Sequence, residues 1–163
     1  MAPSHAWNPD QLAAATAPLR PDMAIEVVEQ IDSSNTELMR RGRAGQLAPV
    51  VLVAERQTAG RGRQGRHWKS ALGESLTFSL SLPLAIADWS GLSLAVGVAL
   101  CEAVGSVAGS ESDGLRAGLK WPNDIWLMNG DEGRKLGGVL IETVAAGARR
   151  PGQQWQGWVG SHG

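Results

Sequence analysis

The chain has 163 residues, of which 43% are hydrophobic, so it can bury the core of one domain. Its net charge of −1 and pI near 6.3 argue against general binding to nucleic acids or membrane surfaces. The single cysteine, Cys101, excludes internal disulfides and is expected to be a buried structural thiol in a reducing compartment. Without a signal-like or membrane-length apolar segment, we expect a cytoplasmic protein without membrane association. The three histidines have no ligand-like spacing, so no protein-built metal site is predicted.

The first third of the chain predicts two helices and two strands. Asn8 followed by Pro9 is typical of a helix start, and the Ala-rich stretch after it predicts a short helix. Residues 25–31 predict a strand, and the capping box Ser34–Glu37 then predicts the start of a second helix. Residues 49–54 predict a buried strand. Hydroxyl groups and free N–H groups at the second helix start are suited to holding polar atoms of a ligand.

Residues 55–69 form a basic, glycine-rich loop. Five cations fall in it: Arg56, Arg61, Arg63, Arg66 and Lys69. Glycines let backbone N–H groups approach an anion, and arginine provides planar charged groups for phosphate or carboxylate. The pattern therefore predicts an anion-binding loop, although a disordered basic surface loop would be the default for this stretch alone.

Two other interpretations of this loop are disfavoured. Its glycines at positions 60, 62 and 65 match the dinucleotide-binding fingerprint, but a strand pattern follows, where that fingerprint requires a helix and a later acid. An RGG-like nucleic-acid segment would be repetitive, and this loop has no repeats and lies between two strand patterns.

The next stretch predicts a strand and a helix. Apolar residues alternate with Ser and Thr over residues 76–82, which predicts a half-buried strand that ends at Pro83. Apolar residues at helical spacing over 89–107 predict one continuous helical face, and residues 109–114 a polar connection.

Two apolar strands are then predicted over 119–128 and 134–144, joined as a hairpin by the turn-rich residues 129–133. Lys120 and Lys135 are lone cations in these strands. A lysine there is costly unless it is paired or holds an anion.

Four motifs now occur in one order. They are Asp32-Ser-Ser-Asn35, Gln57-Thr-Ala-Gly-Arg-Gly-Arg-Gln-Gly-Arg66, Lys120-Trp-Pro-Asn-Asp124 and Arg134-Lys-Leu-Gly-Gly-Val-Leu-Ile-Glu142. As an ordered set they resemble the catalytic domain of biotin protein ligases, the biotin–[acetyl-CoA-carboxylase] ligase family, over roughly residues 25–160. The resemblance implies an α+β fold: a mixed, largely antiparallel sheet flanked by helices, similar to lipoate ligases and class II tRNA synthetases.

The resemblance also implies a two-step reaction. The biotin carboxylate attacks the α-phosphate of ATP, with Mg²⁺, to give biotinoyl-AMP and pyrophosphate. The ε-amine of a lysine on a biotin carboxyl carrier protein domain then attacks this anhydride. Two anions meet in the first step, which explains why fixed cations are needed around them.

By resemblance, most of the binding residues precede residue 70. Those expected to hydrogen-bond the biotin head group are Ser33, Ser34, Asn35 and Gln57. Arg61 and Arg63 would hold the adenylate phosphate and the biotin carboxyl group, and the backbone from Gly60 through Gly62 to Arg63 would wrap the ligand and exclude water. Trp68 would cover the adenylate or, equally, anchor the end of the loop.

Four further site residues follow residue 119 by the same resemblance. Lys135 would contact both the biotin carboxylate and the α-phosphate, and Asp124 would position or deprotonate the incoming lysine. Asn123 and Lys120 would support the phosphate side, whereas Trp121 and Pro122 are expected to be core residues. We expect Lys135, Arg63 and Asp124 to be the catalytic groups.

The sequence departs from the family pattern in two places. At Ser34 threonine is common in the family, and the hydroxyl is kept; the second departure lies near the end of the sequence. Residues 154–160 predict a last strand, and 161–163 a tail without the family's usual continuation, so we expect a truncated or frame-shifted ligase. Residues 1–24 are expected to be an extension with a short helix, too short for a DNA-binding domain, so no DNA partner is expected. Two alternatives stay open: a lipoate–protein ligase, and a domain that binds biotin, or nothing, without turnover.

Overall fold

The computed structural model describes residues 7–107 and 115–145. The chain divides into two compact units. The first unit contains Met1–Ala87 and Ile141–Gly163, and the second contains Asp88–Leu140. Whether residues 25–160 act as one catalytic domain stays a prediction, and the predicted strand at 154–160 lies outside the described residues.

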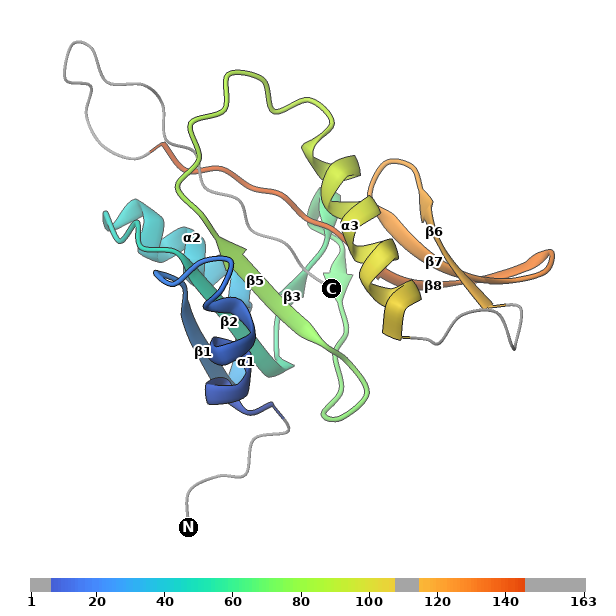
Figure 1. Cartoon of the computed structure of the whole chain (residues 1–163), viewed down its shortest axis with the longest axis horizontal. Coiled ribbons are helices and arrows are strands. Elements are labelled where there is room, and N and C mark those ends of the chain that lie inside the picture. Colours follow the sequence, from blue (N-terminus) through green and yellow to red (C-terminus); the bar gives the residue numbers. More distant parts are fainter. Residues whose placement is uncertain (1–6, 108–114, 146–163) are drawn as a thin grey trace. The chain divides into compact units, whose positions relative to one another are not determined.

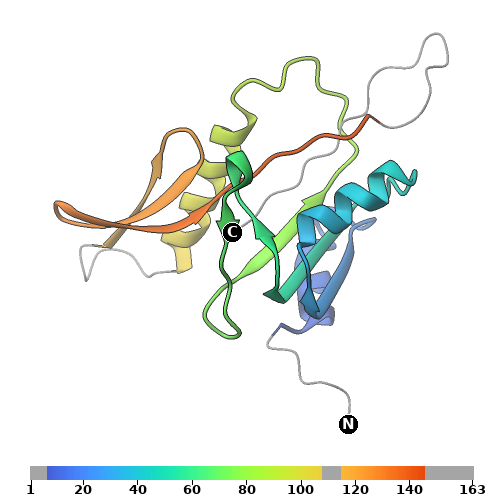
Figure 2. The ribbon, with the colours of Figure 1, turned by 180° about the vertical axis from the view of Figure 1, so that it is seen from behind.

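The first unit is built on a three-stranded mixed sheet with strand order β1-β2-β5. Its elements are α1 (Pro9–Thr16), β1 (Ala24–Ile31), α2 (Ser34–Arg43), β2 (Val50–Gln57), β3 (Gly60–Arg61), the 3₁₀ helix η1 (Arg63–Gly65), β4 (His67–Trp68) and β5 (Thr77–Ser81). β1 is parallel to β2, because α2 carries the chain back across the sheet, and β2 is antiparallel to β5. Figures 1 and 2 show α1 and α2 on opposite faces of this sheet.

The predicted helix starts are confirmed, with one shift in the cap of α2. Asn8 caps α1 by accepting hydrogen bonds from two backbone N–H groups. In α2 the N-cap is Ser33 rather than Ser34, and its hydroxyl accepts from the backbone N–H of Thr36 at 3.3 Å. Leu38 is then buried against Val50 and Leu52 of β2, so the apolar face of the helix fixes where its N-terminus lies.

An ion-pair network joins α2 to β1. Arg41 donates two hydrogen bonds to the carboxylate of Glu26, at 2.8 and 2.9 Å, and one to Glu37 at 2.8 Å. The hydrogen bonds that Arg41 donates to Glu26, and then the one to Glu37, raise the pKa of Arg41 well above its ordinary value. The side chain of Arg41 is 25% exposed, between those of Glu37 at 18% and Glu26 at 37%, so solvent screens its ion pairs only partly.

Strand β5 reverses the expected burial. Its fully buried side chains are hydroxyls, Thr77, Ser79 and Ser81. Phe78 and Leu80, the apolar residues that the alternation predicts as the buried face, are half-buried. Two of the three buried hydroxyls have partners, which offsets the cost of burying them: the Thr77 hydroxyl donates to the carbonyl of Ala54 at 2.6 Å, and Ser79 hydrogen-bonds to Ser34 of α2. The Ser81 hydroxyl has no partner among the described residues.

The second unit packs a helix on a three-stranded antiparallel sheet of order β6-β7-β8. Its elements are α3 (Leu92–Val107), β6 (Leu115–Lys120), β7 (Asp124–Asn129) and β8 (Glu132–Gly138). Gly97 lets α3 approach β6 closely, because a Cβ atom there would lie 2.5 Å from Leu119 Cδ1 and would displace the end of that side chain. Cys101 of α3 is half-buried rather than buried, and this burial raises the pKa of its thiol.

The structure corrects the predicted hairpin in three ways. The expected single strand 119–128 is two strands, since the chain turns at 121–123 and Lys120 pairs with Asp124 across the turn. Pro122 cannot donate a ladder hydrogen bond, which favours a turn there. Trp121 is 77% exposed and is not a core residue. The last strand ends at Gly138, well before residue 144, whereas the predicted turn between β7 and β8 is confirmed.

Within residues 7–107 and 115–145, no helix combines the length and apolar character needed to cross a membrane.

Candidate active site

The side-chain amide of Gln57, at the end of β2, is held in one orientation by α2. Its Oε1 accepts from the backbone N–H of Ser34 at 2.8 Å and from the Ser34 hydroxyl at 3.2 Å. A backbone N–H only donates, so oxygen must face Ser34 and Nε2 must face away. Gln57 is 5% exposed, and its Nε2 has no hydrogen-bond partner among the residues described.

The side-chain amide of Asn35, the second residue of α2, directs its nitrogen rather than its oxygen at its protein partner. Its Nδ2 donates to Oε2 of Glu142, which belongs to the same unit. Asn35 is 1% exposed, and its Oδ1 finds no partner in the described part of the chain. A buried amide group without a partner is costly. The start of α2 and the end of β2 therefore present one unpaired acceptor and one unpaired donor.

Ser34 and Ser79 connect this arrangement to strand β5 of the sheet. The Ser34 hydroxyl also hydrogen-bonds to the hydroxyl of Ser79 on β5 at 2.8 Å, and both residues are fully buried. Ser33, buried as well, donates its backbone N–H to Asp32 at 2.8 Å. The polar face of β5 thus supports Ser34, which in turn orients Gln57.

The basic loop contains a short hairpin in which β3 pairs with β4. Gly60 lies against Trp68: a Cβ atom at Gly60 would be 2.6 Å from the Trp68 carbonyl oxygen and 3.4 Å from Gln57 Nε2. The unpaired Gln57 nitrogen therefore lies beside the loop backbone. Arg61 extends from the same strand to Glu142, with 3.9 Å between Nη2 and Oε1.

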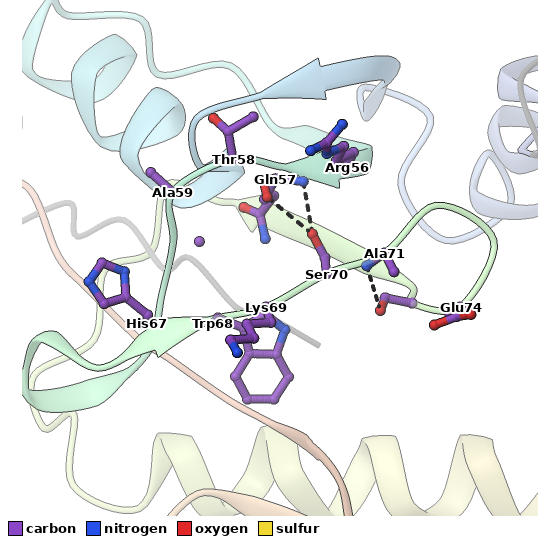
Figure 3. A pocket seen from close by; sticks show the side chains of 12 residues that line it. Arg56, Gln57, Thr58, Ala59, His67, Trp68, Lys69, Ser70, Ala71 and Glu74 are labelled. Carbon is purple, nitrogen blue, oxygen red and sulfur yellow. Dashed lines mark hydrogen bonds between the residues drawn. The ribbon is translucent and has the colours of Figure 1, made fainter.

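A pocket of about 670 Å³ opens along this hairpin. Its walls include Gln57, Gly60, Trp68 and Lys69. Figure 3 shows the Ser70 hydroxyl beside the end of β2, where it accepts from the backbone N–H of Gln57 at 2.9 Å. The pocket is large enough for a ligand of cofactor size.

The tip of the hairpin carries the other two predicted loop residues. The N–H of Gly62 donates to the Arg66 carbonyl at 2.7 Å, and Arg63 begins η1. Strand β4 follows this three-residue 3₁₀ turn, which confirms that the glycines do not open the α-helix that a dinucleotide fingerprint requires.

The remaining predicted site residues belong to the second unit. Lys135 donates to Asp124 Oδ1 at 2.7 Å, and Lys120 Nζ lies 4.1 Å from the ring centroid of Trp126. The two lysines are therefore not lone cations, because each has a partner on β7. Asn123 exchanges hydrogen bonds with the backbone of Val139, which holds the β6–β7 turn against the segment after β8.

The structure thus divides the predicted site residues between the units. It brings together Ser33, Ser34, Asn35, Gln57, Gly60, Arg61 and Trp68 in the first, with Gly62 and Arg63 further along the hairpin. It gathers Lys120, Asn123, Asp124 and Lys135 around the β6–β7 turn of the second. Sequence reasoning assigned no role to Ser79, Ser70 or Glu142. Only Glu142 carried a signal, as an acid directly after an apolar run.

No group of three His, Cys, Asp or Glu side chains that would hold a metal ion occurs within residues 7–107 and 115–145.

Comparison with known proteins defines the class to which this site belongs. Residues 27–154 match the model of the Biotin/lipoate A/B protein ligase family, so the chain belongs to that family of ligases. Among its relatives is the biotin–[acetyl-CoA-carboxylase] ligase of Mycobacterium tuberculosis (strain ATCC 25618 / H37Rv), 36% identical over 139 residues, which cover 83% of this chain and 49% of that protein. Another is the bifunctional ligase/repressor BirA of Escherichia coli (strain K12), 38% identical over 122 residues, 73% of this chain and 35% of that protein.

Solved structures agree in fold. The biotin acetyl coenzyme A carboxylase synthetase of Helicobacter pylori, with bound biotinylated ATP, matches with a TM-score of 0.58 and 29% identity, over 84% of this chain and 59% of that chain. The biotin protein ligase of Aquifex aeolicus, in complex with biotin and ATP, matches with a TM-score of 0.55 and 26% identity, over 84% and 51%. The predicted α+β fold is confirmed. The chain spans about half the length of these proteins, and 35% of the length of BirA.

Proposed function

We propose that this chain carries the catalytic activity of a biotin–protein ligase. It activates biotin with ATP, as the magnesium complex, to biotinoyl-5'-AMP, and transfers it to a lysine of a biotin carrier domain of the acetyl-CoA carboxylase type. The observation that carries the proposal is the buried pair of unpaired amide atoms, Asn35 Oδ1 and Gln57 Nε2. A cyclic urea offers N–H donors and a carbonyl acceptor side by side, which complements one acceptor and one donor.

In the first step, negative charge accumulates where the biotin carboxylate meets the α-phosphate. Arg61 and Arg63 of the loop and Lys135 of β8 are proposed to stabilise that charge. Lys135 is already paired with Asp124, at 2.7 Å, so its ammonium is held in one place rather than swinging freely. The binding of anions would have to compete with or extend this pair.

In the second step, the incoming lysine amine must lose a proton as it attacks the anhydride. Asp124 is proposed to position that amine or accept its proton, and Asn123 and Lys120 to support the phosphate side. Trp68 and the backbone of the β3–β4 hairpin are proposed to cover the adenylate, because an acyl phosphate anhydride is hydrolysed when water reaches it.

The lipoate alternative fits the buried amides less well. The dithiolane ring of lipoate has neither an N–H nor a carbonyl, so binding it would leave Asn35 Oδ1 and Gln57 Nε2 unpaired. Each unpaired buried group costs about 1–3 kcal/mol. The site therefore favours a ligand that carries a cyclic urea.

Calorimetry and pyrophosphate release together test the proposal. Biotin should bind, and dethiobiotin, which keeps the urea and the carboxylate, should bind measurably, whereas lipoate should bind at least about tenfold more weakly. With ATP and biotin, pyrophosphate should appear, and addition of a carrier domain should yield biotinylated protein. Biotin binding without pyrophosphate would favour the non-catalytic alternative, and preference for lipoate would refute the proposal.

A further inference from the structure

Glu142 makes two contacts that the proposed reaction does not use. Its Oε2 accepts from Asn35 Nδ2 at the start of α2, and its Oε1 lies 3.9 Å from Arg61 of the β3–β4 hairpin. One carboxylate, 28% exposed, therefore joins the helix start to the basic loop. Figure 2 shows the segment that carries it, after β8, crossing the unit beside α2 and β3.

The chemistry of this contact fixes the direction of the Asn35 amide. An amide can present either its oxygen or its nitrogen, and turning it by half a rotation exchanges them at little cost. An ionised carboxylate only accepts, so it selects the orientation with Nδ2 toward Glu142. Oδ1, buried and without a partner among the described residues, is then committed to facing a donor.

The segment carrying Glu142 is itself held in place. Val144, two residues further on, is buried with Met39 of α2, and Leu47 packs against both. The carboxylate is thereby anchored on the same helix whose second residue it orients. Such anchoring is what a polar positioning group needs, because an unanchored acid would move away with the amide.

We infer that Glu142 is a positioning residue that sets the hydrogen-bonding direction of Asn35, and so makes this end of the site selective for a ligand with an N–H donor. It does so without touching the ligand, and its second contact keeps Arg61 beside the same position. The inference rests on the proposed function for the identity of that ligand as biotin.

Reversal of the pair provides the test, with four proteins: the parent, Asn35→Asp, Glu142→Gln, and the double variant. Asn35→Asp places two carboxylates against each other and should raise the Kd for biotin at least about tenfold. Glu142→Gln can donate or accept, so the Asn35 amide loses its fixed direction, and the KM for biotin should rise about threefold to tenfold. In the double variant, the amide introduced at position 142 must donate to a carboxylate that only accepts, so the Kd should return to within about threefold of the parent.

Glu29→Gln is the matched control, since Glu29 is an exposed acid on β1 of the same unit. It should leave the Kd for biotin within about twofold of the parent. Thermal unfolding of the same panel supplies a readout that needs no ligand, and the double variant should recover the stability that Asn35→Asp loses. If Asn35→Asp does not fold, comparison of Glu142→Gln with the double variant decides the matter.

Failure of the proposed function and failure of the role assigned to Glu142 give different results. A parent that does not bind biotin refutes the proposed function. The thermal unfolding data then test the contact between Asn35 and Glu142 alone. If the double variant does not recover the stability that Asn35→Asp loses, the role of Glu142 is overturned. A parent that binds biotin, with the double variant as weak as Asn35→Asp, overturns the role of Glu142. A loss of stability in Glu142→Gln with an unchanged KM for biotin also overturns it, because the contact would then be purely structural.

Discussion

Substitution of Gly60 by alanine should damage both the β3–β4 hairpin and the adjoining ligand site. The new methyl group would lie 2.6 Å from the backbone carbonyl oxygen of Trp68, the residue paired with Gly60. It would also lie 3.3 Å from Trp68 Cβ and 3.4 Å from Gln57 Nε2. A backbone carbonyl in a paired strand cannot move away as a flexible side-chain end does, so the hairpin must shift as a whole.

The magnitude follows from this geometry. Insertion of a methyl group into a packed position without room for it costs about 1–3 kcal/mol. For a chain of this size, each kcal/mol corresponds to about 2–4 °C in Tm. Because Gln57 Nε2 is the unpaired donor of the site, its displacement should also raise the Kd for biotin about tenfold.

Gly62→Ala is the matched control for stability. A Cβ atom there would meet Arg66 at 3.6 and 3.8 Å, which is ordinary van der Waals contact. Gly62 has φ −107°, which alanine adopts without strain. Its free energy of unfolding should therefore stay within about 0.5 kcal/mol of the parent.

Thermal unfolding by circular dichroism and biotin calorimetry on the parent and both variants provide the assay. Gly60→Ala should lower the Tm and weaken biotin binding, and Gly62→Ala should leave the Tm unchanged. Equal stability of the two variants would show that steric contact with Trp68 does not shape the hairpin, and this reasoning would then be refuted.

Three further predictions follow from other parts of the structure. Lys135→Ala should lower the single-turnover rate of biotin adenylation at least about tenfold, or about 1.4 kcal/mol, whereas its neighbour Arg134→Ala should not; equal rates would remove Lys135 from the reaction. Amide hydrogens of residues 58–70, where cations repel one another, should exchange more slowly once biotin is bound, and unchanged protection at saturation would mean that the loop is preformed or uninvolved. Arg41→Ala should lower the free energy of unfolding in urea by about 1 kcal/mol, since it removes hydrogen bonds to two carboxylates. Substitution of Arg43, the last residue of the same helix, by alanine should lower it less, and the reverse order would contradict the role of Arg41.

The sequence alone determined the two N-terminal helix starts and the turn between β7 and β8, because their signals are local. Asn8 before Pro9, and the serines before α2, mark helix starts through hydrogen bonds that span only a few residues. The turn between β7 and β8 is marked by its own residues. The ordered motifs likewise identified the family, since side-chain chemistry such as arginine in a glycine-rich loop is visible without coordinates.

The tertiary structure decided what depends on partners distant in the chain. The alternation over 76–82 predicts apolar residues inside, yet burial on β5 belongs to its hydroxyls, because Ser34 and the Ala54 carbonyl supply hydrogen bonds from elsewhere. Lys135 is paired with Asp124 across neighbouring strands, a register that no local pattern encodes. The contact between Asn35 and Glu142 joins residues 107 positions apart. The direction of a buried amide is set by the partner it meets, and only the folded chain determines which partner that is.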